Sequence, residues 1–182
     1  MGRWTLNDIS WGMFDSSKVD NKLLEIVRAA SMVEYRSADY TAYLSQVFVD
    51  DESFRTDIVQ WGSEERQHGL ALAKWASIAD VDFDFDAAFS DFEKNYNLPL
   101  SVDRSIRGSR TGELLSRCVV EIGTSSFYSA IADASREPVL RQICTLIARD
   151  EFAHYGLFRR HMERYQLKER IGLWPRVSVA MG

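Results

Sequence analysis

Two glutamate and histidine pairs share one spacing, and their side chains are of types that bind metal ions. Glu65 and His68 stand three residues apart in "SEERQHG", and Glu151 and His154 repeat the spacing in "RDEFAH". Residues three apart on an α-helix differ by about 60° in direction, so each pair can face one side of its helix. Carboxylate oxygen and imidazole nitrogen together suit iron or manganese. The two E-x-x-H pairs therefore predict a metal site shared by two helices.

Two further glutamates, each among apolar or small residues, extend this pattern. Glu34 lies in "SMVEYRSADY" and precedes Glu65 by 31 residues, and Glu121 lies in "CVVEIGTSSF" and precedes Glu151 by 30 residues. A helix rises about 1.5 Å per residue, so two hairpins with nearly equal spacing place all these side chains at a similar height. Four carboxylates and two imidazoles can hold two divalent ions and leave positions open. Two such ions would neutralise the four carboxylates.

A second pair of carboxylates accompanies the histidines. Glu64 and Asp150 each come directly before a ligand glutamate and four residues before a ligand histidine. A carboxylate that binds the second ring nitrogen of a histidine fixes the tautomer that ligates the metal. We therefore predict that Glu64 and Asp150 each orient one imidazole, either on their own helix or across the bundle.

Long helices are needed to position these residues. Only three prolines interrupt the chain, at positions 99, 138 and 175. Acidic residues at 50–52 suit the start of one helix, and Ser135 with Pro138 suits the start of another. The predicted core helices cover residues 18–48, 51–78, 109–134 and 136–167.

The connections between these helices predict the topology. Short links within each pair favour antiparallel hairpins, and residues 79–108 form one long crossover between the second and third helices. The fold class is therefore all-α, a ferritin-like four-helix bundle, with residues 1–182 as a single domain. Aromatic residues of the crossover, in "DVDFDFDAAFSDFE", predict an extended segment and a short helix that cap the bundle.

Composition excludes several other classes of protein. The net charge is −5, which argues against a nucleic-acid partner. Two cysteines, Cys118 and Cys144, are too few for a rubredoxin, four-cysteine zinc or iron–sulfur site, and we predict that both are reduced core residues. No apolar run approaches the length of a membrane span and no signal peptide is evident, which predicts a cytoplasmic protein. The third histidine, His161, is expected on the surface.

Two segments resemble those of a known family. "WGSEERQHG" is similar to the W-x-x-E-E-x-x-H-G segment of acyl-carrier-protein desaturases, and "QICTLIARDEFAH" is similar to their Q-I-C-x-x-I-A-x-D-E-x-x-H segment. Through these motifs the chain resembles the ferritin-like non-haem di-iron carboxylate proteins, which also include rubrerythrins. The resemblance covers the four-helix core, and the desaturases are longer chains. It implies two iron ions, with manganese or a mixed pair as alternatives, on Glu34, Glu65, His68, Glu121, Glu151 and His154.

The same resemblance suggests roles for two more residues. Thr124 comes one turn after Glu121 and matches a threonine that lies beside the metals in desaturases and is implicated in oxygen activation. A threonine inside a helix also commonly bonds a carbonyl one turn back. Trp61 matches a tryptophan near the ligands of the second helix, and core packing is the alternative interpretation.

Three functions are compatible with such a site. The favoured one is an oxidase, oxygenase or desaturase that activates O2 to oxidise an apolar organic substrate, which could be an acyl chain. The alternatives are a ferroxidase or iron-storage protein and a rubrerythrin-like peroxidase, although rubrerythrins usually carry rubredoxin cysteines that this sequence lacks. No dinucleotide motif or cysteine cluster is present, so we expect an external electron donor such as a ferredoxin. A homodimer is compatible with the sequence.

A pocket for the substrate is also expected beside the metals. Small or polar residues near the ligand faces of the first and third core helices would leave space for it. The predicted lining residues are Ala30, Ala38, Gly123, Ser125 and Tyr128.

Overall fold

The computed structural model describes residues 4–95, 102 and 104–170. These residues form six α-helices, three single-turn 3-10 helices near the N-terminus and no strand, which confirms the predicted all-helical class. The α-helices are α1 (Asn21–Tyr35), α2 (Ser37–Val47), α3 (Glu52–Ala79), α4 (Phe85–Asn95), α5 (Arg110–Ala134) and α6 (Pro138–Glu169). None of these helices is long and apolar enough to cross a membrane.

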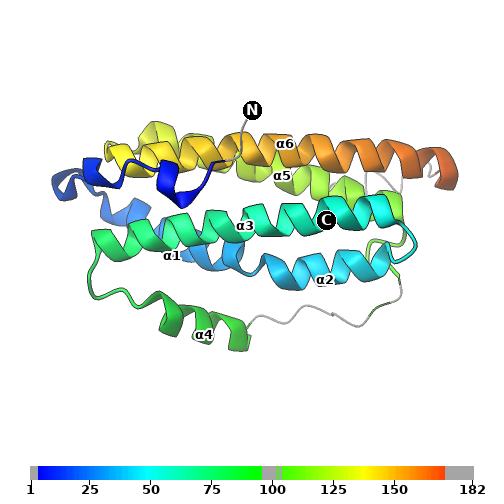
Figure 1. Ribbon diagram of the computed structural model, residues 1–182, viewed down its shortest axis with the longest axis horizontal. Helices are drawn as coiled ribbons and strands as arrows, with labels where there is room; N and C mark the ends of the chain where they lie inside the picture. Colours follow the sequence, from blue (N-terminus) through cyan, green and yellow to red (C-terminus); the bar gives the residue numbers. More distant parts are fainter. Residues whose placement is uncertain (1–3, 96–101, 103, 171–182) are drawn as a thin grey trace.

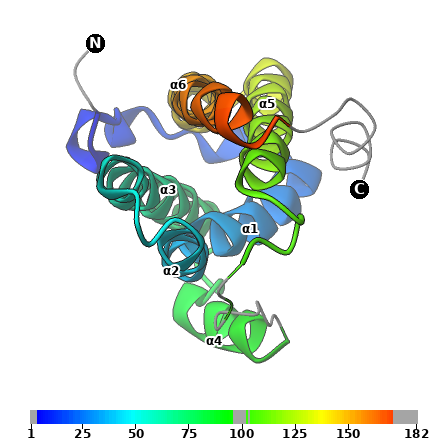
Figure 2. The same cartoon turned by 90° about the vertical axis from the view of Figure 1, so that its right-hand side faces the viewer.

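Two antiparallel helical pairs lie side by side. One pair consists of α3 and the consecutive helices α1 and α2, and the other consists of α5 and α6 (Figure 1). Helices α3 and α5 begin at the same end of the bundle and run in the same direction, joined by the connection over residues 80–109. Helix α4 belongs to this connection and lies outside the bundle, beside α1 and α2 (Figure 2). This arrangement places the ligand-bearing helices α1, α3, α5 and α6 around one interior.

Side-chain caps define where the long helices begin. Asp51 accepts a hydrogen bond from the Phe54 amide at the start of α3, and Ser109 accepts one from Gly112 at the start of α5. For α6 the cap is Glu137, which accepts from the Leu140 amide, rather than the expected Ser135. These caps satisfy amide groups that have no partner within the helix.

The single helix expected over 18–48 is wrong, because the chain breaks at Arg36 between α1 and α2. The break lies at a close contact with α3 that sequence periodicity does not reveal. A Cβ atom at Gly69 would lie 2.5 Å from the Tyr35 amide nitrogen, and one at Gly62 would lie 2.1 Å from Thr41 Oγ1. The Ser37 hydroxyl also donates to the Gly62 carbonyl, at 2.9 Å. The two glycines therefore let the α1–α2 junction press against α3.

Two apolar clusters fill the bundle on either side of its middle. One contains Val27, Leu72 and Trp75 with the first turns of α6, and the other contains Phe54 and Phe158 with the last turns of α6. Cys144 lies in the first cluster and Cys118 in the second, and both thiols are free and buried, as predicted for core residues. The E-x-x-H segments fall between the two clusters.

His161 is buried, so its predicted surface position is wrong. It is 6% exposed, and its Nε2 lies 2.8 Å from Asp57 Oδ2 while its Nδ1 lies 2.7 Å from Arg164 Nη2. Its place seven residues after His154 puts it two turns along the same inward face of α6. Helical periodicity counted from His154 is the sequence signal that indicates this position.

The α6 and α3 sides of the bundle are covered by the N-terminal segment, and the α1 side by α4. Trp4 and Ile9 are buried in the first apolar cluster. On the other side, Phe85 and Phe89 of α4 contact the Tyr35 ring edge to face. The aromatic residues of the crossover thus cover the bundle as the sequence predicts.

The close contact at Gly69 predicts an asymmetry between two glycine substitutions. Gly69→Ala should lower the free energy of unfolding by about 1 to 3 kcal/mol, because the added methyl group overlaps Tyr35 backbone atoms. Gly123→Ala is the matched control, since a Cβ there meets nothing within 4 Å, and the better helix propensity of alanine should raise stability by up to about 1 kcal/mol. Denaturant unfolding of both variants measures the difference. Equal effects would mean that the α1–α3 contact is not close at Gly69.

Candidate metal centre

Six potential ligands from four helices meet in the middle of the bundle. Helix α1 contributes one glutamate, α5 contributes another, and α3 and α6 each contribute an E-x-x-H pair. All six residues are at most 7% exposed, which is rare for carboxylates without partners. They are Glu34, Glu65, His68, Glu121, Glu151 and His154.

These residues form two groups of four that share two members. Within each group, one candidate ligand atom per residue lies within 4.8 Å of all the others. The first group is Glu34, Glu65, His68 and Glu151. The second group is Glu65, Glu121, Glu151 and His154. Glu65 and Glu151, the first residues of the two E-x-x-H pairs, therefore lie between the two groups, where each could bridge two ions.

The histidines present the same ring nitrogen to the interior. His68 Nδ1 lies 3.2 Å from Glu151 Oε1, and His154 Nδ1 lies 2.9 Å from Glu65 Oε1. Both Nδ1 atoms are buried without a hydrogen-bond partner of suitable geometry. The same holds for one carboxylate oxygen on each of three glutamates, namely Glu65, Glu121 and Glu151. Leaving so many buried polar atoms unsatisfied is costly, and a pair of divalent cations would satisfy them. The donor set therefore fits two metal ions.

The other ring nitrogen of each histidine binds a carboxylate across the bundle. His68 of α3 has its Nε2 3.1 Å from Asp150 Oδ2 of α6, and His154 of α6 has its Nε2 2.9 Å from Glu64 Oε2 of α3. These reciprocal contacts resolve the choice that the sequence left open. Each carboxylate fixes an imidazole with Nδ1 directed at the glutamates.

Trp4 is a member of this network that sequence reasoning missed. Its indole Nε1 donates to Asp150 Oδ2 at 2.7 Å, and its ring stacks on His68 with the centroids 6.0 Å apart. Gln67 of α3 donates to the Trp4 carbonyl at 2.9 Å, which fixes the N-terminal segment over the site. No local pattern in the N-terminal segment indicates this contact.

The electrostatics of the cluster reflect its burial. Burial raises the pKa of Glu65 well above 4.5, and the carboxylates of Glu151 and Glu34 raise it further. Burial and the charge of Glu151 likewise raise the pKa of Glu34. Burial alone would lower the pKa of His68, but the hydrogen bond with Asp150 and the close carboxylate of Glu151 outweigh it and raise that pKa to about 10. Without metal, the cluster therefore holds protons that metal ions would displace.

His154 and Asp150 follow the same logic. Burial opposes the charged form of His154, but the close carboxylates of Glu121, Glu64 and Glu65 raise its pKa above the usual range. Burial would raise the pKa of Asp150, whereas the hydrogen bond with His68 outweighs it, so the pKa lies below the usual value. Asp150 is therefore ionised when it orients His68.

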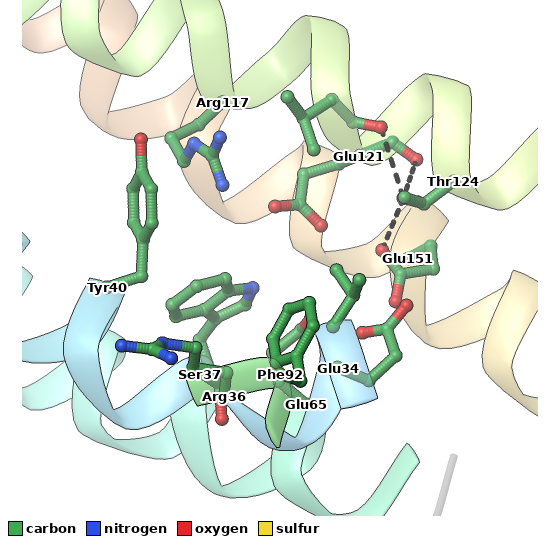
Figure 3. Close-up of a pocket in the computed structure, with 13 residues that line it drawn as sticks. Glu34, Arg36, Ser37, Tyr40, Glu65, Phe92, Arg117, Glu121, Thr124 and Glu151 are labelled. Atoms are coloured by element: carbon green, nitrogen blue, oxygen red, sulfur yellow. Dashed lines mark hydrogen bonds between the residues drawn. The ribbon is translucent and has the colours of Figure 1, made fainter. Parts of the chain in front are cut away.

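Hydroxyl groups contact two of the glutamates. Thr124 Oγ1 lies 2.6 Å from Glu151 Oε2 and 3.1 Å from the carbonyls of Val120 and Glu121 (Figure 3). The hydroxyl has a single hydrogen, so it donates to one of these acceptors at a time, and the shortest contact is to the carboxylate. The Tyr128 hydroxyl donates to Glu34 Oε1. Both contacts hold carboxylates of the cluster in place.

A cavity of about 250 Å³ opens onto one side of the cluster, at the break between α1 and α2. Figure 3 shows Glu34, Glu151 and Thr124 on one side of it and Tyr40 and Arg117 on the other. Its lining residues are Val33, Glu34, Arg36, Ser37, Tyr40, Trp61, Glu65, Phe92, Arg117, Val120, Glu121, Thr124 and Glu151.

The predicted lining of small residues is wrong. The residues concerned were Ala30, Ala38, Gly123, Ser125 and Tyr128, and none of them lines this cavity. Gly123 is exposed, because it follows Glu121 by two residues and so points about 200° away around the helix. Positions three and four residues from Glu121, which are occupied by Thr124 and Arg117, face the cavity instead.

Comparison with protein-family models, with curated proteins and with solved structures found no match to this chain.

The two overlapping groups predict different metal stoichiometries for different substitutions. Glu65→Gln should weaken the binding of both ions, because Glu65 belongs to both groups. Glu34→Gln should weaken only the binding of the ion beside His68. At limiting metal we expect less than about one ion per chain for the first variant and about one for the second. Metal analysis after gel filtration measures this, with exposed Glu163→Gln of α6 as the control. The bridging assignment fails if Glu34→Gln loses as much metal as Glu65→Gln.

The raised pKa values predict how the stability of the metal-free protein depends on pH. A histidine whose pKa is raised on folding stabilises the folded chain below its unfolded pKa, and this stabilisation is lost as the pH rises through the folded pKa. For His68 the loss runs from pH 6.5 to about 10, and the raised pKa values of Glu34 and Glu65 act in the same direction. We expect a loss of a few kcal/mol in the free energy of unfolding over this range.

In the metal-loaded protein, the extra stability that metal binding contributes should rise with pH, because the ligands must release protons to bind metal. Melting temperatures of both forms, measured across the same pH range, test this pair of expectations. A metal-free protein that becomes more stable as the pH rises would contradict the burial of these protonated groups.

Proposed function

We propose that the chain is a non-haem di-iron oxidoreductase that activates O2 to oxidise a small apolar organic substrate. In this proposal the bundle is ferritin-like, with iron as the native metal and manganese or a mixed pair as alternatives. The antiparallel pairs joined by one long connection support that topology. A desaturation or a hydroxylation of the substrate fits this reaction class.

The observation that carries the proposal is a two-metal donor set that has a cavity on one side. Glutamates that belong to both groups suit ions held close together, and the buried Nδ1 atoms without partners suit neutral imidazole ligands. A structural metal site needs no space beside it, whereas a catalytic site needs an open position for reactants. The cavity reaches Glu34, Glu65, Glu121 and Glu151, so a substrate within it would lie against the ligands.

The bound ions would supply the redox chemistry, and the chain would position the reactants. Thr124 contacts Glu151 and lines the cavity, so its hydroxyl can give a hydrogen bond to this carboxylate or to a reactant. Apolar side chains such as Val33, Val120 and Phe92 would exclude water from the substrate. Reduction of O2 by four electrons takes two from the substrate and two from outside, so an external donor such as a ferredoxin completes the proposal.

Iron storage is the main competing function. It requires iron to pass through the site in quantity, whereas a retained pair of ions suits ligands that are as enclosed as Glu121, Glu151 and His68. The depth at which the ligands are buried and the apolar side chains that line the cavity favour the oxidase. A peroxidase would use the same ligands with peroxide in place of O2.

Loading metal-free protein with ferrous ion under anaerobic conditions and then admitting O2 tests the proposal. We expect about two irons retained per chain, a single rapid phase of oxygen consumption, and no further uptake when more ferrous ion is added. The double variant Glu65→Gln/Glu151→Gln should lose this phase while keeping its helical circular dichroism. Continued oxidation of many irons per chain with a growing mineral would favour storage, and consumption of peroxide but not O2 would favour the peroxidase.

A further inference from the structure

The end of the cavity away from Glu34 and Glu151 carries positive charge. Arg117 of α5 comes four residues before Glu121, which places it about 6 Å farther along the same face of the helix. Its guanidinium points into the cavity between Tyr40 and Glu121 (Figure 3). The cavity therefore has a carboxylate end, which metal ions would neutralise, and an arginine end.

The two arginines at this end differ in their contacts. Arg36 donates from Nε to Asp39 Oδ2 at 2.8 Å and from Nη1 to the Glu93 carbonyl at 3.4 Å. Arg117 instead packs its guanidinium 4.1 Å from the centre of the Tyr40 ring, and its Nε is buried without an acceptor. Among the described residues, no ion pair is formed by Arg117. Its positive charge is therefore available to a ligand.

Trp61 provides a second donor without an acceptor in the same cavity wall. Its side chain is 3% exposed and its indole Nε1 is buried with no hydrogen-bond partner. Its ring packs edge to face against the rings of His154 and Phe158, whose centroids lie 6.5 Å and 5.6 Å away. A buried donor left unpaired is unfavourable, so a ligand with acceptor oxygens would be stabilised by pairing with it.

We propose that the cavity binds a small organic acid, with its carboxylate on Arg117 and its apolar body extending toward the glutamate cluster. This inference rests on the proposed function and names the class of its substrate. Arginine suits this role because its planar N–H groups match a carboxylate. Trp61 donates to an acceptor of the same ligand, and Val33, Val120 and Phe92 surround its apolar part.

The size of the cavity limits the acid. A cavity of about 150 Å³ is enough to hold benzene, so about 250 Å³ accommodates an apolar body and a carboxylate of about ten non-hydrogen atoms in total. The charge distribution fixes the orientation. Four glutamates already balance two divalent ions, whereas nothing described balances Arg117, so the acid places its negative charge at the arginine end.

Binding of 3-phenylpropanoate and its neutral amide tests the proposal. The protein is loaded with zinc, which is redox-inert, its metal content is measured, and both compounds are titrated by calorimetry. We expect the acid to bind at least about tenfold more tightly than the amide, because a charge-assisted hydrogen bond contributes about 1.5 to 3 kcal/mol. In Arg117→Gln this preference should disappear, and in the control Arg160→Gln, an exposed arginine of α6, it should persist.

Three results would overturn the proposal: equal binding of acid and amide to the unchanged protein, no binding of either, or a preference for the acid that survives in Arg117→Gln. The last result would place the carboxylate on the metal ions. If Arg117→Gln does not fold, Arg117→Lys keeps the charge without the planar donors and should lose most of the preference. The comparison of acid with amide in the unchanged protein still decides.

The metal content separates the two proposals. Two zinc ions without a preference for the acid leave the di-metal site standing, whereas no bound zinc refutes that site, and the comparison then runs on metal-free protein.

Discussion

The burial of four carboxylates in the middle of a helical bundle is the constraint on which the rest of the structure depends. Ionised carboxylates are expensive to bury unless they are paired with positive charge. In the metal-free chain the two histidines provide part of this charge, and their pKa values are raised accordingly. The oxygens and ring nitrogens that remain without partners are ones that cations at the centre of the cluster could satisfy. Apolar clusters lie on both sides of the buried carboxylates.

Neighbouring elements of the fold serve to hold this cluster in one geometry. The reciprocal contacts of Asp150 with His68 and of Glu64 with His154 connect α3 to α6 on both sides of the centre. Trp4 extends one of these contacts to the N-terminal segment. The break between α1 and α2 has a different effect. It opens the bundle beside the glutamates and places the Arg36 end of α1 and the start of α2 around a cavity instead of continuing the helix across it.

Much of the site could be predicted because helical geometry converts sequence spacing into direction and height. The E-x-x-H spacing and the intervals of 31 and 30 residues are sufficient to bring six ligands together, and the structure does so. The features that escaped prediction depend on contacts between distant segments. The break at Arg36 adjoins Tyr35, which contacts Gly69 of another helix, and Trp4 donates a hydrogen bond to the distant Asp150. His161 and Gly123 were different, since the periodicity already visible around His154 and Glu121 indicates which way each of them points.

Anomalous X-ray scattering from crystals of the manganese-loaded protein tests the central claim most directly, because it locates ions independently of activity. Two peaks are expected in the middle of the bundle, about 3.5 to 4 Å apart, one beside His68 and the other beside His154. Glu65 and Glu151 should each lie within bonding distance of both peaks. A single peak, or peaks confined to exposed acidic residues with the central glutamates free of metal, would contradict a two-metal centre in this protein.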